Sequence, residues 1–468
     1  MSRINTNISS LQAIHTLGRN QTDLNTRLQR LSTGLKINTG KDAPAGLIAS
    51  ETLRSEINGI HQAIDNSTRA GNVINTAEGA LSEVSALLLE VQSLTNEAAN
   101  TGALSPEEIK ANQLQVDAIL NSVNRIANTT QFNGIKLLNG SLDYTTSGVA
   151  STAIDNMQLN SAKIPDNGSV TVVVQVVASA QLAEVGFTAS GIGNSAVTIQ
   201  IGGNAGVEQL SFAASTHNSA IAVAINQITQ ATGVSAVLSG GALRITSTAY
   251  GSKQFVSVQS VVGTFVNGKD TGQDAQVNIN GTKAEVDGLT ASVRSENLDV
   301  KLDLDSVFGT TPDPLGTTFT VTGGGAKFQL GSQVNRQGQI NIGIGAVSTS
   351  NLGSGIYGYL SSLGSGGANS LLSSNTIQSQ KIITAAIRQV ADLRGRLGAL
   401  QKDVLETNIN SLNVALENVT ASESAIRDAD FASETASLTR AQILVQANTS
   451  VLSQANSSPQ QVLSLLGR

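Results

Sequence analysis

Three histidines are the residues of this chain best suited to bind a metal ion or to transfer protons near neutral pH. They are His15, His61 and His217. They lie far apart in the sequence, and none belongs to an H-E-x-x-H pattern, which places two zinc ligands and a general base on one helix. The sequence therefore predicts no catalytic zinc site, and surface or helix-packing positions are expected for all three.

One glycine pattern could bind a nucleotide phosphate. The segment GSGIYG, from Gly353 to Gly358, matches G-x-G-x-x-G. In a dinucleotide-binding fold a helix begins at the third glycine, and an acidic residue follows about 20 positions later. Neither feature is present here, and the absence of cysteine also removes disulfides and thiol chemistry. We expect no cofactor and no enzymatic activity.

The composition excludes two further classes of partner. The 468-residue chain has a net charge of -6 with scattered Lys and Arg, so it lacks the basic face that binds a phosphate backbone. No apolar run approaches the ~20 residues that cross a bilayer, and the first residues lack the apolar segment of a signal peptide. Nucleic acid and membrane are therefore not expected partners.

The first residues predict an amphipathic helix, because apolar residues recur at helical spacing and the opposite face is polar. Its proposed self-association stripe includes Ile4, Ile8, Leu11, Leu24, Leu28 and Leu31. The segment LSTGLKINTGKDAPAGL then interrupts the pattern, and its hinge candidates are Gly34, Gly40, Pro44 and Gly46. These residues can separate two helices so that each meets a different neighbour, although an ordinary interhelical loop would have the same composition.

Two more helices are expected before residue 130. A stripe from Leu53 to Val91 has gaps of three and four, which suit a coiled-coil-like seam that Ser67 and Gly71 weaken. The next helix begins at SPEE, where Ser105 can cap and Glu108 can return the capping-box bond, and it should run to about Ile126.

The last ninety residues are also helical in pattern. Apolar positions from Ile383 to Val419 predict one long helix. The final stripe has heptad spacing, and its residues are Phe431, Leu438, Val445 and Leu452, with Ala441 and Ala455 on the same seam. A packed helical hairpin in a globular protein would show the same spacing.

Residues 141 to about 375 are different, with much Gly, Ser, Thr and Val and period-two alternation that predicts strands. The expected strands are 169–177, 196–201, 242–247, 254–260 and 298–305, with a hairpin turn at Asn280-Gly281 and one helix at 219–229. We therefore predict an α+β multidomain fold, in which discontinuous coiled-coil-like helical domains from both ends enclose an inserted β-rich domain.

Both ends resemble bacterial flagellin, the subunit of the flagellar filament. The motifs that carry the resemblance are INTNISSLQA, RLSTGLKINTGKDAPAG, TQFNGIKLL, FQLGSQ with LGSG, LGALQ and RDADFASETASLTRAQILVQANTSVLSQAN, followed by VLSLLGR. They occur in order over about 140 residues at each end. The resemblance implies an inner-tube domain of residues 1–45 with 425–468, an outer-tube domain of 46–148 with 326–424, and a β-rich surface domain of 149–325.

The resemblance also implies partners and a location. Copies of the chain would form a helical homopolymer for swimming motility, in contact with hook-associated and cap proteins. An export chaperone and the flagellar type III export apparatus would deliver the chain unfolded to an extracellular filament. The segment 34–46 would be the spoke between the two helical tubes.

Some flagellins are detected by the animal receptor Toll-like receptor 5 through an arginine, a leucine and a glutamate. The equivalent positions here are Glu90, Leu94 and Gln115, of which only the leucine matches. Replacing a cation by an anion reverses a charge contact, so we expect weak recognition.

We hypothesise that about 40 residues at each end fold only when neighbouring copies cover their apolar stripes. Removal of residues 1–30 or 440–468 should then leave a soluble β-rich core that forms no filaments. The alternatives are a hook-associated junction protein, which shares the helical ends, and a surface adhesin that uses the β-rich middle.

Overall fold

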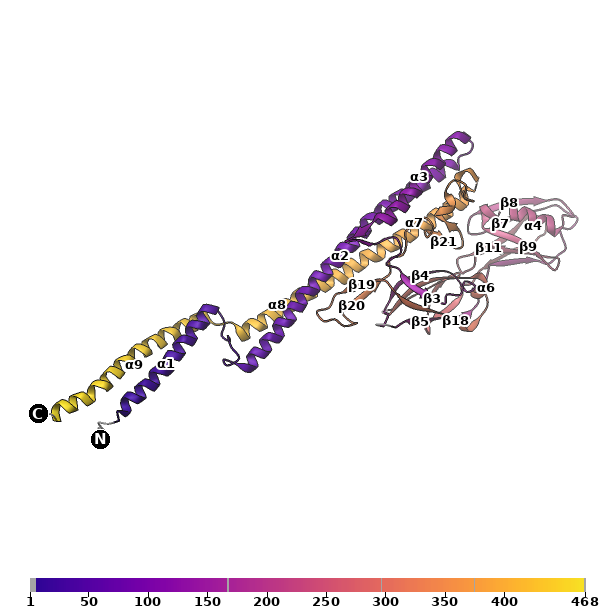
Figure 1. Ribbon diagram of the computed structural model, residues 1–468. Coiled ribbons are helices and arrows are strands. Elements are labelled where there is room, and N and C mark those ends of the chain that lie inside the picture. Colours follow the sequence, from indigo (N-terminus) through magenta and orange to yellow (C-terminus); the bar gives the residue numbers. More distant parts are fainter. Residues whose placement is uncertain (1–5, 166–167, 296, 374, 467–468) are drawn as a thin grey trace. The chain divides into compact units, whose positions relative to one another are not determined.

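The computed structural model describes residues 6–165, 168–295, 297–373 and 375–466. The chain divides into two units, and the first consists of Met1–Arg69, Gln329–Gly338 and Asp403–Arg468. The second consists of Ala70–Phe328 and Gln339–Lys402. Helices form both ends of the chain and strands fill the middle (Figure 1), which confirms the predicted α+β class. The predicted three-domain division at residues 45, 148, 325 and 424 stays a prediction.

The first unit is built from helices. They are α1 (Ile8–Thr33), the first part of α2 (Pro44–Ala98), α8 (Thr407–Arg427) and α9 (Phe431–Leu466). The helices α1 and α9 lie side by side and run antiparallel (Figure 1), because residues near the start of α1 contact residues near the end of α9. Ile4 lies outside the described residues.

The expected weakness in the middle of α2 does not interrupt the helix. Ser67 is buried, its hydroxyl donates to the Ala63 carbonyl at 2.8 Å, and the Asn408 side chain donates to it at 3.1 Å. Gly71 faces open space. A serine that bonds back to its own helix and to a neighbouring helix keeps its polar group satisfied, so the helix continues through it.

The second unit contains the rest of α2, α3 (Pro106–Thr129) and α7 (Thr376–Ala399), and the Glu78 carboxylate of α2 pairs with Arg394 of α7. Both capping-box bonds at Ser105 and Glu108 are present, as the sequence predicts. The apolar positions of these helices are buried; they include Ile74, Leu81, Leu88, Val116, Val123, Ile383, Val390 and Leu397. The predicted single C-terminal helix is in fact α7, a π-helical stretch at Leu400–Glu406 and α8.

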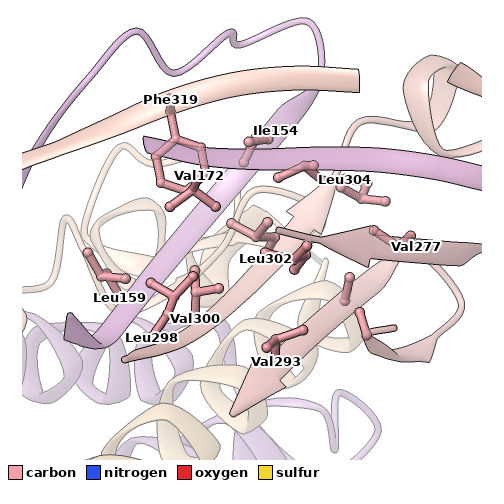
Figure 2. Close-up of a cluster of buried hydrophobic side chains, with 14 of the residues drawn as sticks. Ile154, Leu159, Val172, Val277, Val293, Leu298, Val300, Leu302, Leu304 and Phe319 are labelled. Atoms are coloured by element: carbon pink, nitrogen blue, oxygen red, sulfur yellow. The ribbon is translucent and has the colours of Figure 1, made fainter. Parts of the chain in front are cut away.

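Nine strands form the first β core. One sheet has the order β14-β13-β5-β18-β3 and the other β15-β16-β17-β4. The strand bounds are β3 Tyr144–Ser147, β4 Ile154–Ala162, β5 Val170–Ala178, β13 Gln276–Ile279, β14 Thr282–Lys283, β15 Glu285–Asp287, β16 Thr290–Arg294, β17 Leu298–Leu304 and β18 Asp313–Gly324. Phe319, Val172, Val300 and Leu302 point into the core between them (Figure 2).

Seven strands and two helices form the second β core. Its sheets have the orders β6-β10-β9 and β12-β11-β7-β8. The bounds are β6 Glu184–Phe187, β7 Val197–Gly202, β8 Val207–Phe212, α4 Asn218–Gln227, α5 Thr229–Thr232, β9 Val234–Ser239, β10 Ala242–Ser247, β11 Phe255–Val262 and β12 Gly268–Thr271. The predicted strands 169–177, 196–201, 242–247, 254–260 and 298–305 correspond to β5, β7, β10, β11 and β17, and they are confirmed.

Short elements complete the chain. They are the pairs β1 (Gln131–Phe132) with β2 (Ile135–Lys136), β19 (Ala326–Gln329) with β20 (Gln339–Ile342) and β21 (Gly353–Ser354) with β22 (Gly358–Tyr359), the helix α6 (Ser306–Gly309), and 3-10 turns at Leu360–Leu363 and Leu371–Ser373. Asn280 and Gly281 have φ of 51° and 77° and join β13 to β14, as a type I′ turn requires. In the described helices no stretch is long and apolar enough to span a bilayer.

Candidate functional site

The candidate functional site is the antiparallel pair of terminal helices, α1 and α9. Asn7 caps α1, since its side-chain oxygen accepts the Ser10 amide at 3.0 Å. Asp430 does the same for α9, accepting the amides of Ala432 and Ser433 at 2.9 and 3.3 Å. Each cap satisfies N–H groups that the first turn of a helix leaves without a partner. A helix-capping Asp just before an amphipathic stretch was a signal that the sequence offered for the start of α9.

The stripe residues predicted for self-association divide into two groups. Leu24, Leu31, Leu438, Val445 and Leu452 are half-buried along the seam between α1 and α9. The others remain exposed although the two helices are paired: Ile8 is 54% exposed, Leu11 51%, Leu28 47% and Phe431 59%. The pair therefore covers only part of the predicted stripe.

Further apolar side chains on the two helices are also left in the open. Ile14 on α1, and Ile443, Leu444 and Val451 on α9, are exposed. Within the described part of α1 the one buried residue is the small Ala13. We call the exposed set Ile8, Leu11, Ile14, Leu28, Ile443, Leu444 and Val451 the outer apolar residues. Exposed large apolar groups at this density on two adjacent helices are typical of an interaction surface.

A charged contact inside the seam was not predicted from the sequence. Arg27 Nη1 lies 3.1 Å from both carboxylate oxygens of Glu434, and Arg30 Nη1 lies 3.9 Å from one of them. The Glu434 side chain is only 10% exposed. No local pattern marks this glutamate, because its partners belong to the other end of the chain.

The segment that follows α1 and the segment that precedes α9 lie against each other. Gly34 ends α1 with φ 73°, and its amide donates to the Arg30 carbonyl at 2.8 Å. The Ala429 amide donates to the Gly34 carbonyl at 2.9 Å, and the Lys36 amide donates to the Arg427 carbonyl at 2.7 Å. The segment after α1 and the segment before α9 thus form a short antiparallel bridge.

Asp42 stabilises the segment between α1 and α2 through hydrogen bonds. Its carboxylate accepts the amides of Asn38 and Thr39 at 3.1 and 2.9 Å, and the Thr39 hydroxyl at 3.0 Å. The amide of Thr39, its hydroxyl and the amide of Asn38 lower the pKa of this carboxyl below its usual value.

The other predicted hinge residues lie before and at the start of α2. Gly40 is exposed, Pro44 is the first residue of α2, and Gly46 lies in its first turn. A Cβ on Gly46 would come within 2.7 Å of Ile37 Cδ1, and Ile37 is buried. Pro44 occupies the position where its missing N–H matters least.

The predicted receptor-surface positions lie in the second unit. Glu90 on α2 and Gln115 on α3 are exposed, whereas Leu94 on α2 is 8% exposed. The leucine that matches the stimulatory pattern is therefore mostly covered by this chain.

The described residues contain neither a metal-binding cluster nor a phosphate-binding loop. His15 and His61 are exposed, His217 precedes α4, and no cluster of metal-ligating side chains occurs in the part of the chain that the structure describes. The segment from Gly353 to Gly358 is the tight β21–β22 hairpin. No α-helix begins at its third glycine, so the geometry of a phosphate-binding loop is not formed.

Sequence comparisons identify relatives along the whole chain. A model of the bacterial flagellin N-terminal helical region matches residues 4–143, and one of the C-terminal helical region matches residues 380–466. The flagellin of Salmonella typhimurium is 30% identical over 505 residues, and the B-type flagellin of Pseudomonas aeruginosa is 30% identical over 512. Each alignment covers 99% of both chains.

Among solved structures, FliC from Burkholderia pseudomallei is 16% identical, with a TM-score of 0.26, covering 71% of this chain and 98% of that one. The flagellar junction protein FlgL from Legionella pneumophila is 14% identical, with a TM-score of 0.27, covering 82% and 99%. The two flagellins that are 30% identical over the full length of this chain show its family. The chain belongs to the bacterial flagellin family, a family of structural proteins that build the flagellar filament, and it is not an enzyme.

Proposed function

We propose that this flagellin polymerises by coupled folding, in which α1 and α9 gain their full stability only between neighbouring copies. The single observation that carries the proposal is that the outer apolar residues stay exposed when α1 and α9 are paired. A second copy of the chain is the occupant that fits them, because members of this family are filament subunits.

The magnitudes support coupled folding. Ordering one residue's backbone costs about 1–2 kcal/mol. Fully burying one Leu or Ile contributes about 1.5–3 kcal/mol. Along α1 the large apolar side chains are half-buried or exposed, so the isolated pair recovers only part of this contribution. Neighbouring copies that cover the outer apolar residues would supply the remainder.

The contact between copies has to be heterologous, meaning that different surfaces of the two copies meet. A heterologous contact that does not close into a ring gives an open helical assembly. In this assembly, residues 1–45 with 425–468 form the inner tube and 46–148 with 326–424 the outer tube. The spoke of residues 34–46, with Gly34, Gly40, Pro44 and Gly46, connects them, and residues 149–325 form the outer surface.

Further partners follow from the same proposal. Hook-associated proteins would meet the filament at its base and cap proteins at its tip. A chaperone would cover the apolar positions after Phe431 before the flagellar type III apparatus exports the chain to the cell exterior. Toll-like receptor 5 would bind weakly, because Glu90 and Gln115 replace the cation and the anion of the stimulatory pattern and Leu94 is covered.

Electron microscopy of the purified full chain, under conditions that promote polymerisation, tests the proposed function. Helical filaments should appear above a critical concentration, and they should lengthen when fragments of preformed filament are added as seeds. Monomers alone, or amorphous aggregates alone, at every concentration and in the presence of seeds would refute the proposal.

A further inference from the structure

The apolar seam between α1 and α9 repeats along both helices. Leu17, Leu24 and Leu31 are spaced seven apart on α1, and Leu438, Val445 and Leu452 are spaced seven apart on α9. All six are half-buried. Sliding one helix by seven residues, about 10.5 Å, would again place apolar groups against apolar groups. The seam by itself therefore does not determine how the two helices align.

Glu434 breaks this repeat. Among the side chains whose burial the structure describes, it is the one buried acidic or basic residue. Its carboxylate is paired with Arg27 and flanked by Arg30, both on α1. A buried charge is tolerated when it is paired and is strongly unfavourable when it is not.

A seven-residue slip would remove this pairing in either direction. A slip in one direction would bring Ala441 to the place of Glu434, and a slip in the other would bring the non-helical segment before α9 to that place. Alanine offers no charge to the two arginines, and the non-helical segment offers no residue in the helical position of Glu434. In both cases Glu434 would also leave its partners on α1. Only the observed alignment pairs the buried carboxylate.

A second polar contact marks the same alignment near the other end of the pair. Pro459 lies inside α9 and has no backbone N–H, so the Ala455 carbonyl lacks its usual donor four residues later. The side-chain nitrogen of Asn7 donates to this carbonyl at 2.7 Å. A slip by seven residues would leave the Ala455 carbonyl without this donor. Pro459 thus leaves an acceptor on α9 free, and Asn7 at the start of α1 donates to it.

We propose that Arg27, Arg30 and Glu434, assisted by Asn7 and the carbonyl that Pro459 leaves free, are a register lock that fixes the axial alignment of α1 and α9 beyond what the backbone bridge between Gly34 and Ala429 allows. Their role is positioning: the lock decides which outer apolar residues of α1 stand level with which of α9. The consequence for a filament rests on the proposed function, whereas the alignment itself is a property of one chain.

The absence of cysteine allows a direct measurement of register. Ser10 Oγ lies 2.7 Å from Asn456 Oδ1, so Ser10→Cys with Asn456→Cys reports the observed register through a short thiol-specific cross-linker. Ser10→Cys with Thr449→Cys reports a slip of one heptad, because Thr449 then takes the place of Asn456. Mass spectrometry separates cross-links within a chain from those between chains.

Each reporter pair is combined with two backgrounds. In the first, Arg27→Leu, Arg30→Leu and Glu434→Leu together replace the lock by apolar groups, which keeps the helices able to pair. The second is a matched control, Arg19→Leu, which removes an exposed arginine of the same helix. Filaments are cross-linked where they form, and a chain that stays unassembled is cross-linked in solution beside the parent monomer, where the cross-linker traps the fraction of chains in which α1 and α9 are paired. A failure to polymerise therefore tests the proposed function, whereas the ratio of the two cross-links still measures the register.

The proposal expects the native-register cross-link to exceed the slipped one at least tenfold in the parent and in Arg19→Leu. In the triple-leucine chain the two yields should come within threefold of each other. Restoring Glu434 and Arg27 in that chain should recover the parent ratio. If the triple-leucine chain keeps the parent ratio, or if Arg19→Leu loses it equally, the register lock is refuted.

Discussion

The carbonyl of Gly34 accepts a hydrogen bond of 2.9 Å from the amide of Ala429, so the break that ends α1 lies against the break that precedes α9. The connections from α1 to α2 and from α8 to α9, all in the first unit, therefore lie at the same place. Because the chain joins α1 and α9 to the rest of the unit through these breaks, the conformation of Gly34 affects the whole terminal pair.

The left-handed conformation of Gly34 gives the first prediction. Its φ is 73° and a Cβ there would meet nothing within 4 Å, so Gly34→Ala adds backbone strain without a clash, about 1–2 kcal/mol. The control is Gly18→Ala inside α1, also in open space, where alanine favours the helix by about 0.5–1 kcal/mol. Filament melting temperature should fall for Gly34→Ala and stay equal or rise for Gly18→Ala. The same change in both variants would contradict the assigned role of Gly34.

The outer apolar residues give a second prediction. Ile443 is 60% exposed, so Ile443→Gln removes little packing within one chain. If a neighbouring copy buries it, the loss of about 1.5–3 kcal/mol raises the critical concentration for polymerisation about tenfold or more. Val207→Gln on β8 is the control, because Val207 is similarly exposed but belongs to the β-rich middle. Sedimentation of filaments measures both, and an unchanged critical concentration for Ile443→Gln would argue against burial between copies.

The pH dependence of the β-rich middle is the third prediction. Asp274 accepts the Ser252 and Gly288 amides at 2.9 and 2.8 Å. Burial alone would raise the pKa of this carboxyl, but the hydrogen bonds from Ser252 and Gly288 lower it below its usual value. Stability from a lowered pKa is present above the unfolded value, about 3.9, and is lost as the pH falls through the folded value.

Asp274→Asn should therefore destabilise the chain by about 1 kcal/mol at pH 7. The difference from the parent should shrink as the pH falls below about 4. Urea unfolding followed by tyrosine fluorescence measures this, since the chain has four tyrosines and no tryptophan. Asp287→Asn, at an exposed pair with Lys253, should change stability little. A difference for Asp274→Asn that persists unchanged into acid would show that its charge is not responsible.

The fourth prediction concerns the immune receptor. A cell reporter for Toll-like receptor 5 should respond weakly to the parent chain, and the paired change Glu90→Arg with Gln115→Glu should raise the response by restoring the charge pattern. Glu83→Arg, at an exposed position on α2, is the control for added positive charge. Full potency of the parent chain would overturn the expectation of weak recognition.

Local signals in the sequence predicted much of the fold. Ser105 with Glu108 predicted the start of α3, Asn280-Gly281 predicted a tight hairpin, and alternation predicted β5, β7, β10, β11 and β17. Each of these depends on neighbours within a few residues. Heptad spacing likewise predicted the seam of α9, but it could not separate the half-buried Leu438 from the exposed Ile443 in a pair of helices.

What the sequence did not predict depends on residues far apart in the chain. Glu434 is a surface-type residue until Arg27 from the other end pairs with it. Asn7 meets the Ala455 carbonyl only after both helices have formed. The π-helical stretch at Leu400–Glu406 inserts extra residues into a turn without a glycine or proline to mark it. Tertiary pairing, rather than local propensity, determines these features.

Hydrogen exchange of the terminal helices, measured on the full chain as dilute monomer and as filament, tests the central claim of coupled folding most directly. The account predicts that amides of α1 and α9 exchange rapidly in the monomer and are strongly protected in the filament, while β5 and β18 are protected in both. Equal protection of α1 and α9 in the monomer, independent of concentration, would contradict it.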